Sequence, residues 1–259
     1  MFKLIFFLWR RSDLDRDAFI DYYENSHAIF GSRIVPRSDD YRRSYPQWER
    51  GSGRGMDDIF SFGPFDVMTE LWFHDRSGRE AQLTEAAKPE VRDAVVADEA
   101  RFMDRSKQAY FVVVEHRSCG TAPGMERAAA KIVHLCRESP NLAPDEFKHR
   151  HERERVPEIE GAVRGLIDYR RNYFVLDDPQ SFAGGVDAQL QLDPEMLSVS
   201  LMEEMWLAST EDLAIAMAAL KRPSALIDSS MSFSIPVDEY RADFGDVMAP
   251  FVLLNERCR

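Results

Sequence analysis

The sequence predicts an α+β protein in which two βαββαβ units share one barrel-like core. Two observations lead to this fold class. The chain has 259 residues, 44% of them hydrophobic, which is enough for one large domain or two smaller ones with a buried core. The segment DYRRSY at Asp40–Tyr45 returns as DYRRNY at Asp168–Tyr173, so the chain contains an internal repeat.

The repeat covers most of the chain. Its first part has a constant offset of 128 positions, which rises to 134 after the DYRR block because the second copy carries six extra residues there. Matching positions include Lys3 with Lys131, Phe19 with Phe147 and Trp72 with Trp206. We therefore expect a first unit at residues 1–117, a linker of small, Pro- and Gly-containing sequence at 118–128, and a second unit at 129–259.

Each unit begins with a strand and a helix. The run FKLIFFLW is short, apolar and rich in aromatic residues, which is typical of a buried strand, and KIVHLCR is its counterpart. The polar residues of Ser12–Asp17 can cap a helix, and Phe19 and Tyr23 follow at helical spacing. We expect this helix to end near Gly31.

Two strands, a second helix and a last strand complete the unit. Tyr41–Tyr45 alternates as a strand does, and FDVMTELWF does so after a Gly-rich stretch at 47–64. We expect the second helix at 77–96 and the last strands at 109–116 and 251–257. This order is that of a ferredoxin-like unit, whose sheet has one uncovered face. Two such sheets packed face to face would form a pseudo-dimeric α/β barrel.

Composition excludes several classes of function. The net charge is −12 and no basic stripe is present, which argues against a nucleic acid or an anionic membrane as partner. The three cysteines are too few and too scattered for a disulfide framework, and no apolar run is long enough to span a membrane. We expect a cytoplasmic protein that is a monomer with an internal pseudo-dimer, or a homodimer.

The first unit resembles the EthD domain of the dimeric α/β-barrel superfamily. The resemblance rests on KLIFFLWRRSDLDRDAFIDYYENSHA, then DYRRSY, then FDVMTELWF, and its most specific positions are Lys3, Arg10, Leu14, Phe19 and His27. The second copy resembles the same family but has Arg155 in place of the histidine. The resemblance implies enzymes that need no cofactor and act on aromatic or polyketide-like compounds, among them cyclases, dehydratases, isomerases and monooxygenases.

His27 is the leading candidate for a catalytic base. It lies toward the end of the first helix, on the face that carries Phe19 and Tyr23, and an imidazole over an aromatic cavity can accept a proton near neutral pH. A histidine at a helix C-terminus can equally serve only to cap the helix dipole.

Glu70 is the second catalytic candidate. Strand alternation places Asp66, Met68, Glu70 and Trp72 on one face, which we expect to point into the barrel and contribute to substrate binding. Burial would raise the pKa of Glu70 and fit it to shuttle protons or orient His27. Because Glu204 repeats it in the copy that lacks the histidine, a structural ion pair with a neighbouring arginine is the alternative.

Tyrosines and one tryptophan complete the expected first site. Tyr41 is the third catalytic candidate, since a phenol hydroxyl can stabilise an oxyanion. The expected substrate-binding set adds the residues Tyr22, Tyr23, Arg43, Tyr45 and Trp48. Each of these aromatic side chains can instead be part of the packed wall.

The second unit has its own candidates but no expected metal site. They are His151, Tyr169 and Glu204. His149 and His151 form an H-x-H pair, but residues two apart on a helix point about 200° away from each other, so the pair is unsuited to one ion.

These observations favour a cofactor-independent lyase or isomerase that dehydrates, cyclises or isomerises an aromatic or polyketide-like small molecule, with His27 as general base. Two alternatives remain. One is a cofactor-free monooxygenase on the same substrate class. The other is a protein that binds a hydrophobic small molecule without turning it over.

Overall fold

The computed structural model describes residues 1–54, 63–118, 128–181, 199–241 and 252–253. The main strands of the first half are β1 (Phe2–Arg10), β2 (Asp40–Pro46), β4 (Val67–Phe73) and β5 (Met103–Arg117). Those of the second half are β6 (Ala130–Glu138), β7 (Leu166–Phe174), β8 (Leu201–Leu207) and β9 (Ile227–Arg241). Two short strands, β3 (Ser52–Arg54) and β10 (Val252–Leu253), pair with β9.

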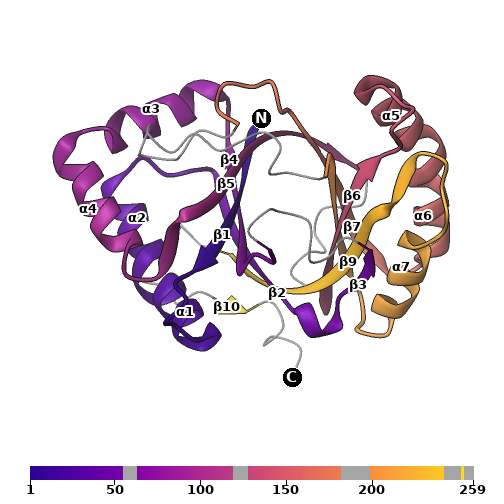
Figure 1. Ribbon diagram of the computed structural model, residues 1–259, viewed down its shortest axis with the longest axis horizontal. Helices are drawn as coiled ribbons and strands as arrows, with labels where there is room; N and C mark the ends of the chain where they lie inside the picture. Colours follow the sequence, from indigo (N-terminus) through magenta and orange to yellow (C-terminus); the bar gives the residue numbers. More distant parts are fainter. Residues whose placement is uncertain (55–62, 119–127, 182–198, 242–251, 254–259) are drawn as a thin grey trace.

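The strands close into one antiparallel barrel (Figure 1). Within the first half the order is β2-β4-β1-β5, and within the second it is β7-β8-β6-β9. Hydrogen bonds join β5 to β7 and β2 to β9, so each half supplies the partners for both edges of the other. The expected face-to-face packing of two sheets is therefore replaced by edge-to-edge pairing, which leaves no unpaired edge among these strands.

Helices cover the outside of the barrel on two opposite sides (Figure 1). The first half contributes α1 (Arg16–Tyr22), α2 (Ala28–Ile34), α3 (Arg76–Ala86) and α4 (Pro89–Glu99). The second half contributes α5 (Pro144–Arg150), α6 (Val156–Ala162) and α7 (Asp212–Leu220). A short 3₁₀ turn, η2 (Trp48–Arg50), follows β2.

A π-helical turn interrupts the first long helix of each half. These turns are η1 (Tyr23–His27), between α1 and α2, and η4 (His151–Arg155), between α5 and α6. The Asp15 carboxylate caps α1 by accepting a hydrogen bond of 2.8 Å from the Ala18 N–H. Because π turns occur mostly as single-turn insertions at functional sites, their position in both halves marks the regions to inspect for chemistry.

Two expected elements differ from the structure. The strand of the second half that is equivalent to β5 is β9, since Lys3 pairs with Val113 in the first half and Lys131 pairs with Val237 in the second. Of the strand expected at 251–257, residues 252–253 form β10 and the others lie outside the described part of the chain. The single helix expected at 77–96 is two helices, because Pro89 starts α4 and disfavours helical geometry at the residue before it.

A network of charged side chains fills part of the barrel interior. Lys3 Nζ lies 2.6 Å from Glu70 and 3.2 Å from Glu204, and Lys131 Nζ lies 2.6 Å from Glu204 and 3.3 Å from Glu70. Lys3 also contacts Glu115 at 2.8 Å. Both lysines are at least 96% buried, so these contacts leave no charge of the group unpaired in the low-dielectric interior.

The polar interior follows the sequence repeat. Trp72 donates its indole N–H to Glu115, and Trp206 does the same to Glu239. Lys3 faces Trp72 across one pair of strands, and Lys131 faces Trp206 across the equivalent pair. Because the two copies have the same spacing, each places an equivalent lysine, tryptophan and glutamate in the barrel interior. In the part of the chain that the structure describes, no helix is both long and apolar enough to cross a membrane.

Candidate active site

A cavity of about 170 Å³ lies outside the barrel, between the strands of the first half and helices η1, α2, α3 and α4. Much of its wall is apolar and includes Phe6, Leu8, Phe30, Leu71 and Val95. Polar side chains also line it, among them Tyr23, His27, Tyr41, Arg79, Glu99 and Tyr110. An apolar cavity with a few polar groups is the usual composition of a small-molecule site.

His27 and Asp98 form a hydrogen-bonded pair at this cavity. His27 Nδ1 lies 2.6 Å from Asp98 Oδ2, so the carboxylate holds the tautomer with the proton on Nδ1. The other ring nitrogen, Nε2, then carries the lone pair. The imidazole is 17% exposed, so it is accessible while its position is fixed.

The fold holds this pair from several sides. Tyr22 donates its hydroxyl to Asp98 Oδ1 at 2.7 Å, and Phe102 packs against the imidazole with a centroid distance of 4.7 Å. Burial alone would raise the pKa of Asp98, but the hydrogen bonds from His27 and Tyr22 outweigh burial and lower it. Asp98 therefore stays ionised and keeps the imidazole oriented.

Arg79 supplies a cation to the same cavity. Its guanidinium donates to the amide oxygen of Gln82, while its Nε is buried without a hydrogen-bond partner, and no carboxylate pairs with it among the described residues. Burial lowers the pKa of Arg79 to about 10, which leaves it charged at neutral pH. A buried cation with a free donor is suited to an anionic oxygen on a ligand.

Two tyrosines form a hydroxyl chain on the opposite wall. Tyr41 donates to the Tyr23 hydroxyl at 3.3 Å, and that hydroxyl lies 2.7 Å from Thr69 Oγ1. Burial raises the pKa of Tyr41 to about 12, so both phenols remain protonated and can act only as hydrogen-bond partners at neutral pH.

Glu99 is the other ionisable group of the cavity. Burial raises its pKa, and Arg105 contacts it at 3.0 Å. The cavity thus places a carboxyl group with a raised pKa near an oriented imidazole, and groups of opposed proton affinity are typical of acid–base sites.

Glu70 does not share this site, contrary to expectation. It points into the barrel, where Lys3 and Lys131 neutralise it, whereas His27 lies on the helix side of the sheet. The expected partner of Glu70 was an arginine, but lysines take that role. Burial and the neighbouring Glu204 raise the pKa of Glu70. Strand alternation, which correctly separated the two faces, also rules out contact between Glu70 and His27.

The other residues on the inner face of β4 are also separate from the cavity. Met68 and Trp72 are buried among the described residues of the barrel interior, with Trp72 packed against the Lys3 ammonium at 4.3 Å. Asp66 precedes the strand and pairs with Arg10 at 2.8 Å. None of these three side chains lines the cavity.

Arg43, Tyr45 and Trp48 have structural partners. Arg43 and Tyr45 both bind the buried Glu24 carboxylate, with Arg43 Nε at 3.1 Å and the Tyr45 hydroxyl at 2.6 Å. Trp48 donates to the carbonyl of Phe65 at 2.8 Å. Residues 55–62 of the Gly-rich stretch at 47–64 lie outside the described part of the chain.

The second half has a different arrangement at the equivalent place. Arg155 occupies the position of His27 and donates to the carbonyls of Ala219 and Leu220, at the end of α7, at 2.9 and 2.8 Å. His151 and Tyr169 lie on the helix side of the sheet. Glu204 points into the barrel. Its neighbour Glu203 is the carboxylate that contacts His151 and Tyr169.

Sequence reasoning missed three groups of the first site: Asp98, Glu99 and Arg79. The two acids occupy the last turn of α4 and its end, where a carboxylate interacts unfavourably with the helix dipole. That placement is the signal that could have identified them. Arg79 gave no signal, because its sequence context is that of an ordinary helix surface.

Within the described ranges, two clusters hold side chains of metal-ligating type within 4.8 Å of one another. Glu70, Glu204 and Glu239 form one, but the two interior lysines already neutralise these carboxylates. His134, Cys136 and Glu203 form the other, on the helix side of the second half.

Comparisons with known proteins agree with this geometry. Among solved structures, the chain is similar to an anthrone oxidase-like protein, with 9% identity and a TM-score of 0.51 over 96% of this chain and 94% of that chain. It is also similar to a candidate monooxygenase from Fusobacterium nucleatum subsp. nucleatum, with 5% identity and a TM-score of 0.52 over 91% of this chain and 90% of that chain. At these identities the similarity shows the fold alone, a barrel of the dimeric α/β type.

The family comparison concerns the first half. None of the curated proteins compared matches the chain. Residues 11–106 match the model of the EthD domain, which confirms the resemblance found in the sequence. This segment contains His27, Asp98 and most of the cavity wall. Residues 11–106 are therefore an EthD-like domain within this chain.

Proposed function

We propose that the first half is a lyase or isomerase that needs no cofactor and acts on a small aromatic or polyketide-like molecule. One observation carries the proposal. His27 lines an apolar cavity while Asp98 holds its Nδ1 at 2.6 Å, which leaves Nε2 as the ring nitrogen that can serve as a general base. The structurally similar solved proteins are described as anthrone oxidase-like and as a monooxygenase, names that are consistent with an enzyme of this substrate class.

The proposed first step is removal of a proton. His27 Nε2 takes it from a carbon next to a carbonyl, or from a phenol, and the electron pair moves onto the substrate oxygen. Arg79 lines the same cavity and stabilises that oxyanion, and the Tyr41 hydroxyl does so once its O–H turns from Tyr23 to the substrate. The imidazolium then returns the proton to another carbon in an isomerisation, or to a departing hydroxide in a dehydration.

The size of the cavity indicates the substrate class. An apolar cavity of about 150 Å³ holds a benzene molecule. The volume here is about 170 Å³, so it accommodates one aromatic ring, with Phe6 and Phe30 among its contacts. A larger polyketide-like molecule would place one ring in the cavity and extend outward from it.

Oxygenation is the second candidate, and the names of the similar solved structures favour it. In that reaction the same carbanion would reduce O₂, converting a methylene group to a carbonyl, with one oxygen atom retained in the product and the other released as water. The step would use the same His27 and the same oxyanion contacts. It would differ from the first candidate in consuming dissolved oxygen.

The proposal assigns chemistry to one of two units. We interpret residues 1–117 and 129–259 as two ferredoxin-like units, which the matching strand orders β2-β4-β1-β5 and β7-β8-β6-β9 support. Only the first has a histidine at the end of its π turn. We expect the second unit to complete the barrel and to lack this activity.

The test is a panel of hydroxyphenyl ketones with one ring, incubated with the wild-type protein and analysed by mass spectrometry and oxygen uptake. No mass change with an altered retention time indicates isomerisation, loss of water indicates dehydration, and oxygen uptake indicates oxygenation. The H27A variant is expected to lose the reaction, and H74A, which alters an exposed histidine, is the matched control. Tight binding without any product would show a binding protein and refute the enzyme proposal.

A further inference from the structure

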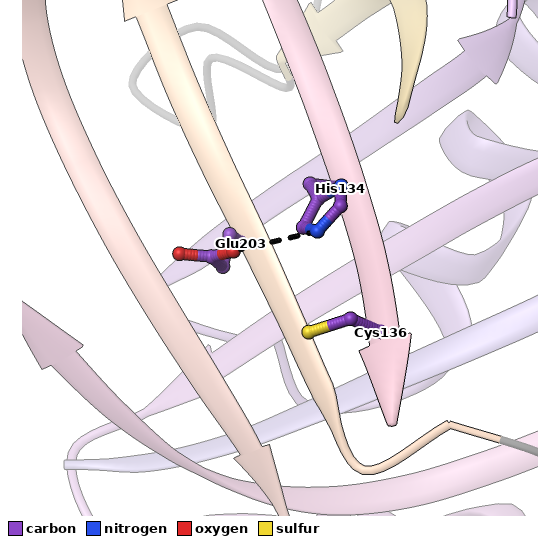
Figure 2. Close-up of side chains that lie close together, drawn as sticks. All are labelled: His134, Cys136 and Glu203. Carbon is purple, nitrogen blue, oxygen red and sulfur yellow. Dashed lines mark ion pairs between the residues drawn. The ribbon is translucent and has the colours of Figure 1, made fainter. Parts of the chain in front are cut away.

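The second half contains a buried cluster of nitrogen, sulfur and oxygen donors. Figure 2 shows His134 and Cys136 on one strand, β6, and Glu203 on the neighbouring strand, β8. Their exposed fractions are 1%, 0% and 1%. These are three side chains that commonly bind transition metals, and they lie together beneath the helices of the second half.

This cluster occupies the place of the first-half cavity. Phe6 pairs with Thr69 across β1 and β4, and His134 pairs with Glu203 across the equivalent strands β6 and β8. By the same repeat, Cys136 replaces the cavity residue Leu8. One copy therefore has an apolar cavity where the other has donor atoms.

A second histidine completes the cluster. His151 stands in the π turn at the position of Tyr23 in the first copy, and it is fully buried. Its Nε2 lies 3.5 Å from Glu203 Oε1. The three-residue cluster offers an imidazole, a thiol and a carboxyl group, and His151 stands beside the carboxyl group as a fourth side chain of a type that zinc prefers.

A hydrogen bond at Nδ1 fixes the orientation of each imidazole. His134 Nδ1 lies 2.9 Å from Ser234 Oγ, and His151 Nδ1 lies 2.9 Å from the Tyr173 hydroxyl. The Nε2 atom of each ring consequently faces Glu203. Metal-binding histidines are usually fixed in this way, with the ring nitrogen that does not bind the metal held by a hydrogen bond.

Unpartnered polar atoms point into the cluster. Within the described residues, His151 Nε2 and Glu203 Oε2 are buried and have no hydrogen-bond partner. A buried polar atom without a partner is costly, so such atoms need an explanation. A metal ion between them would satisfy both.

The distances suit a tetrahedral ion. Zinc lies about 2.0–2.3 Å from its ligands, which places neighbouring ligand atoms roughly 3.3–3.8 Å apart. His134 Nε2 lies 3.8 Å from Glu203 Oε2, and the donor atoms of His134, Cys136 and Glu203 all lie within 4.8 Å of one another.

We propose that His134, Cys136 and Glu203, together with His151, form a binding site for one divalent ion of the zinc class. The ion would replace the thiol proton of Cys136, and the thiolate and carboxylate would balance its two positive charges. Four protein ligands fill a tetrahedral shell, so the site is structural and holds β6 and β8 to the η4 turn. This inference departs from our expectation from the sequence that the protein binds no metal.

The test measures metal binding by the full-length protein without reference to activity. Protein stripped with a chelator is dialysed against Zn²⁺, and metal content is measured by mass spectrometry. Co²⁺ is added to a second sample to record the absorption of a thiolate–cobalt bond. We expect one equivalent of zinc, a thiolate band with cobalt, and a higher melting temperature with zinc than without.

The test variants take their residues from the first copy, which packs the equivalent positions with those side chains. C136L, H134F and E203T each introduce the residue that the first unit has at the equivalent position, and each is expected to weaken zinc binding at least tenfold. H149A changes an exposed histidine of the same helical region and should bind zinc as the wild type does.

Three outcomes would overturn the proposal. They are wild-type protein that retains less than a tenth of an equivalent of zinc, a cobalt spectrum without a thiolate band, and zinc binding that is unchanged in C136L. Should C136L fail to fold, E203Q provides the same comparison with a nearly isosteric side chain. The first two outcomes need no variant.

Discussion

Replacement of Lys3 by methionine tests the interior charge network, on which the closed barrel depends. The Lys3 ammonium lies 2.6 Å from Glu70, 2.8 Å from Glu115 and 3.2 Å from Glu204. Burial alone would lower the pKa of Lys3, but these carboxylates outweigh burial and raise it, so the side chain is charged. Methionine has a similar length but cannot neutralise any of the three.

The expected loss in the free energy of unfolding follows from the burial of Glu70 and Glu204. Glu70 and Glu204 are both 0% exposed, and after the substitution Lys131 would be the lysine left in contact with them, while Asn172 still donates to Glu204. Removing one member of a buried ion pair costs about 3–5 kcal/mol, because the remaining charge is left uncompensated. We expect the free energy of unfolding of K3M to be lower than that of the wild type by about 3–5 kcal/mol.

Urea unfolding followed by far-ultraviolet circular dichroism measures this loss. The control is K88M, the same substitution at a lysine that is exposed and pairs with Glu85 at 2.7 Å, and it should leave the free energy of unfolding nearly unchanged. The double variant K3M/E70Q should lose less than the sum of its two single variants. A loss below about 1 kcal/mol in K3M would refute the argument, since it would mean that the interior lysine is not needed to balance the carboxylates.

Three further predictions concern the first site. D98N should lower the turnover number about 10²–10⁴-fold, because an amide no longer fixes the His27 tautomer. D93N, on the exposed side of α4, is the control and should leave the turnover number unchanged. Equal turnover numbers in the two variants would contradict the assignment of His27 as the base. R79M should weaken the binding of a hydroxyphenyl ketone roughly 10- to 100-fold, as measured by calorimetry. R92M, which changes an exposed arginine, is the control. An unchanged affinity in R79M would exclude Arg79 from the contact with the substrate oxygen. The pKa of Asp98 is lower in the folded protein, so its stabilising effect is present above its unfolded pKa of about 4 and is lost as the pH falls through the folded value. The stability difference between wild type and D98N should therefore shrink on acidification, and urea unfolding that shows a growing difference would contradict the ion pair.

The duplication could be predicted from sequence because it rests on local patterns. The first-unit strands follow the apolar runs, and alternation in β4 correctly separated Glu70 from Thr69. The last strand of the second unit could not be placed in this way. Its sequence, Ile227–Arg241, alternates serines with apolar residues, and only the pairing with β6 shows its role.

The site was harder to predict because its parts come from distant elements. His27 was found through its family motif and its helix position, but Asp98 lies 71 residues away and meets it only after α4 packs beside η1. Glu70 was predicted to share a site with His27. The sequence pattern shows which face of the strand carries Glu70, but it does not show which side of the sheet holds the cavity. The lysines that neutralise Glu70 come from β1 and β6, two strands that single-unit reasoning does not bring together.

Exchange of substrate hydrogen for solvent deuterium tests the central claim most directly. A hydroxyphenyl ketone with one ring is incubated in D₂O with the wild type, with H27A and with D98N, and the proton next to the carbonyl is followed by nuclear magnetic resonance. Deprotonation at His27 predicts exchange by the wild type, slower exchange with D98N and background exchange with H27A, whichever product forms afterwards. Exchange that is equally fast with H27A would contradict the account.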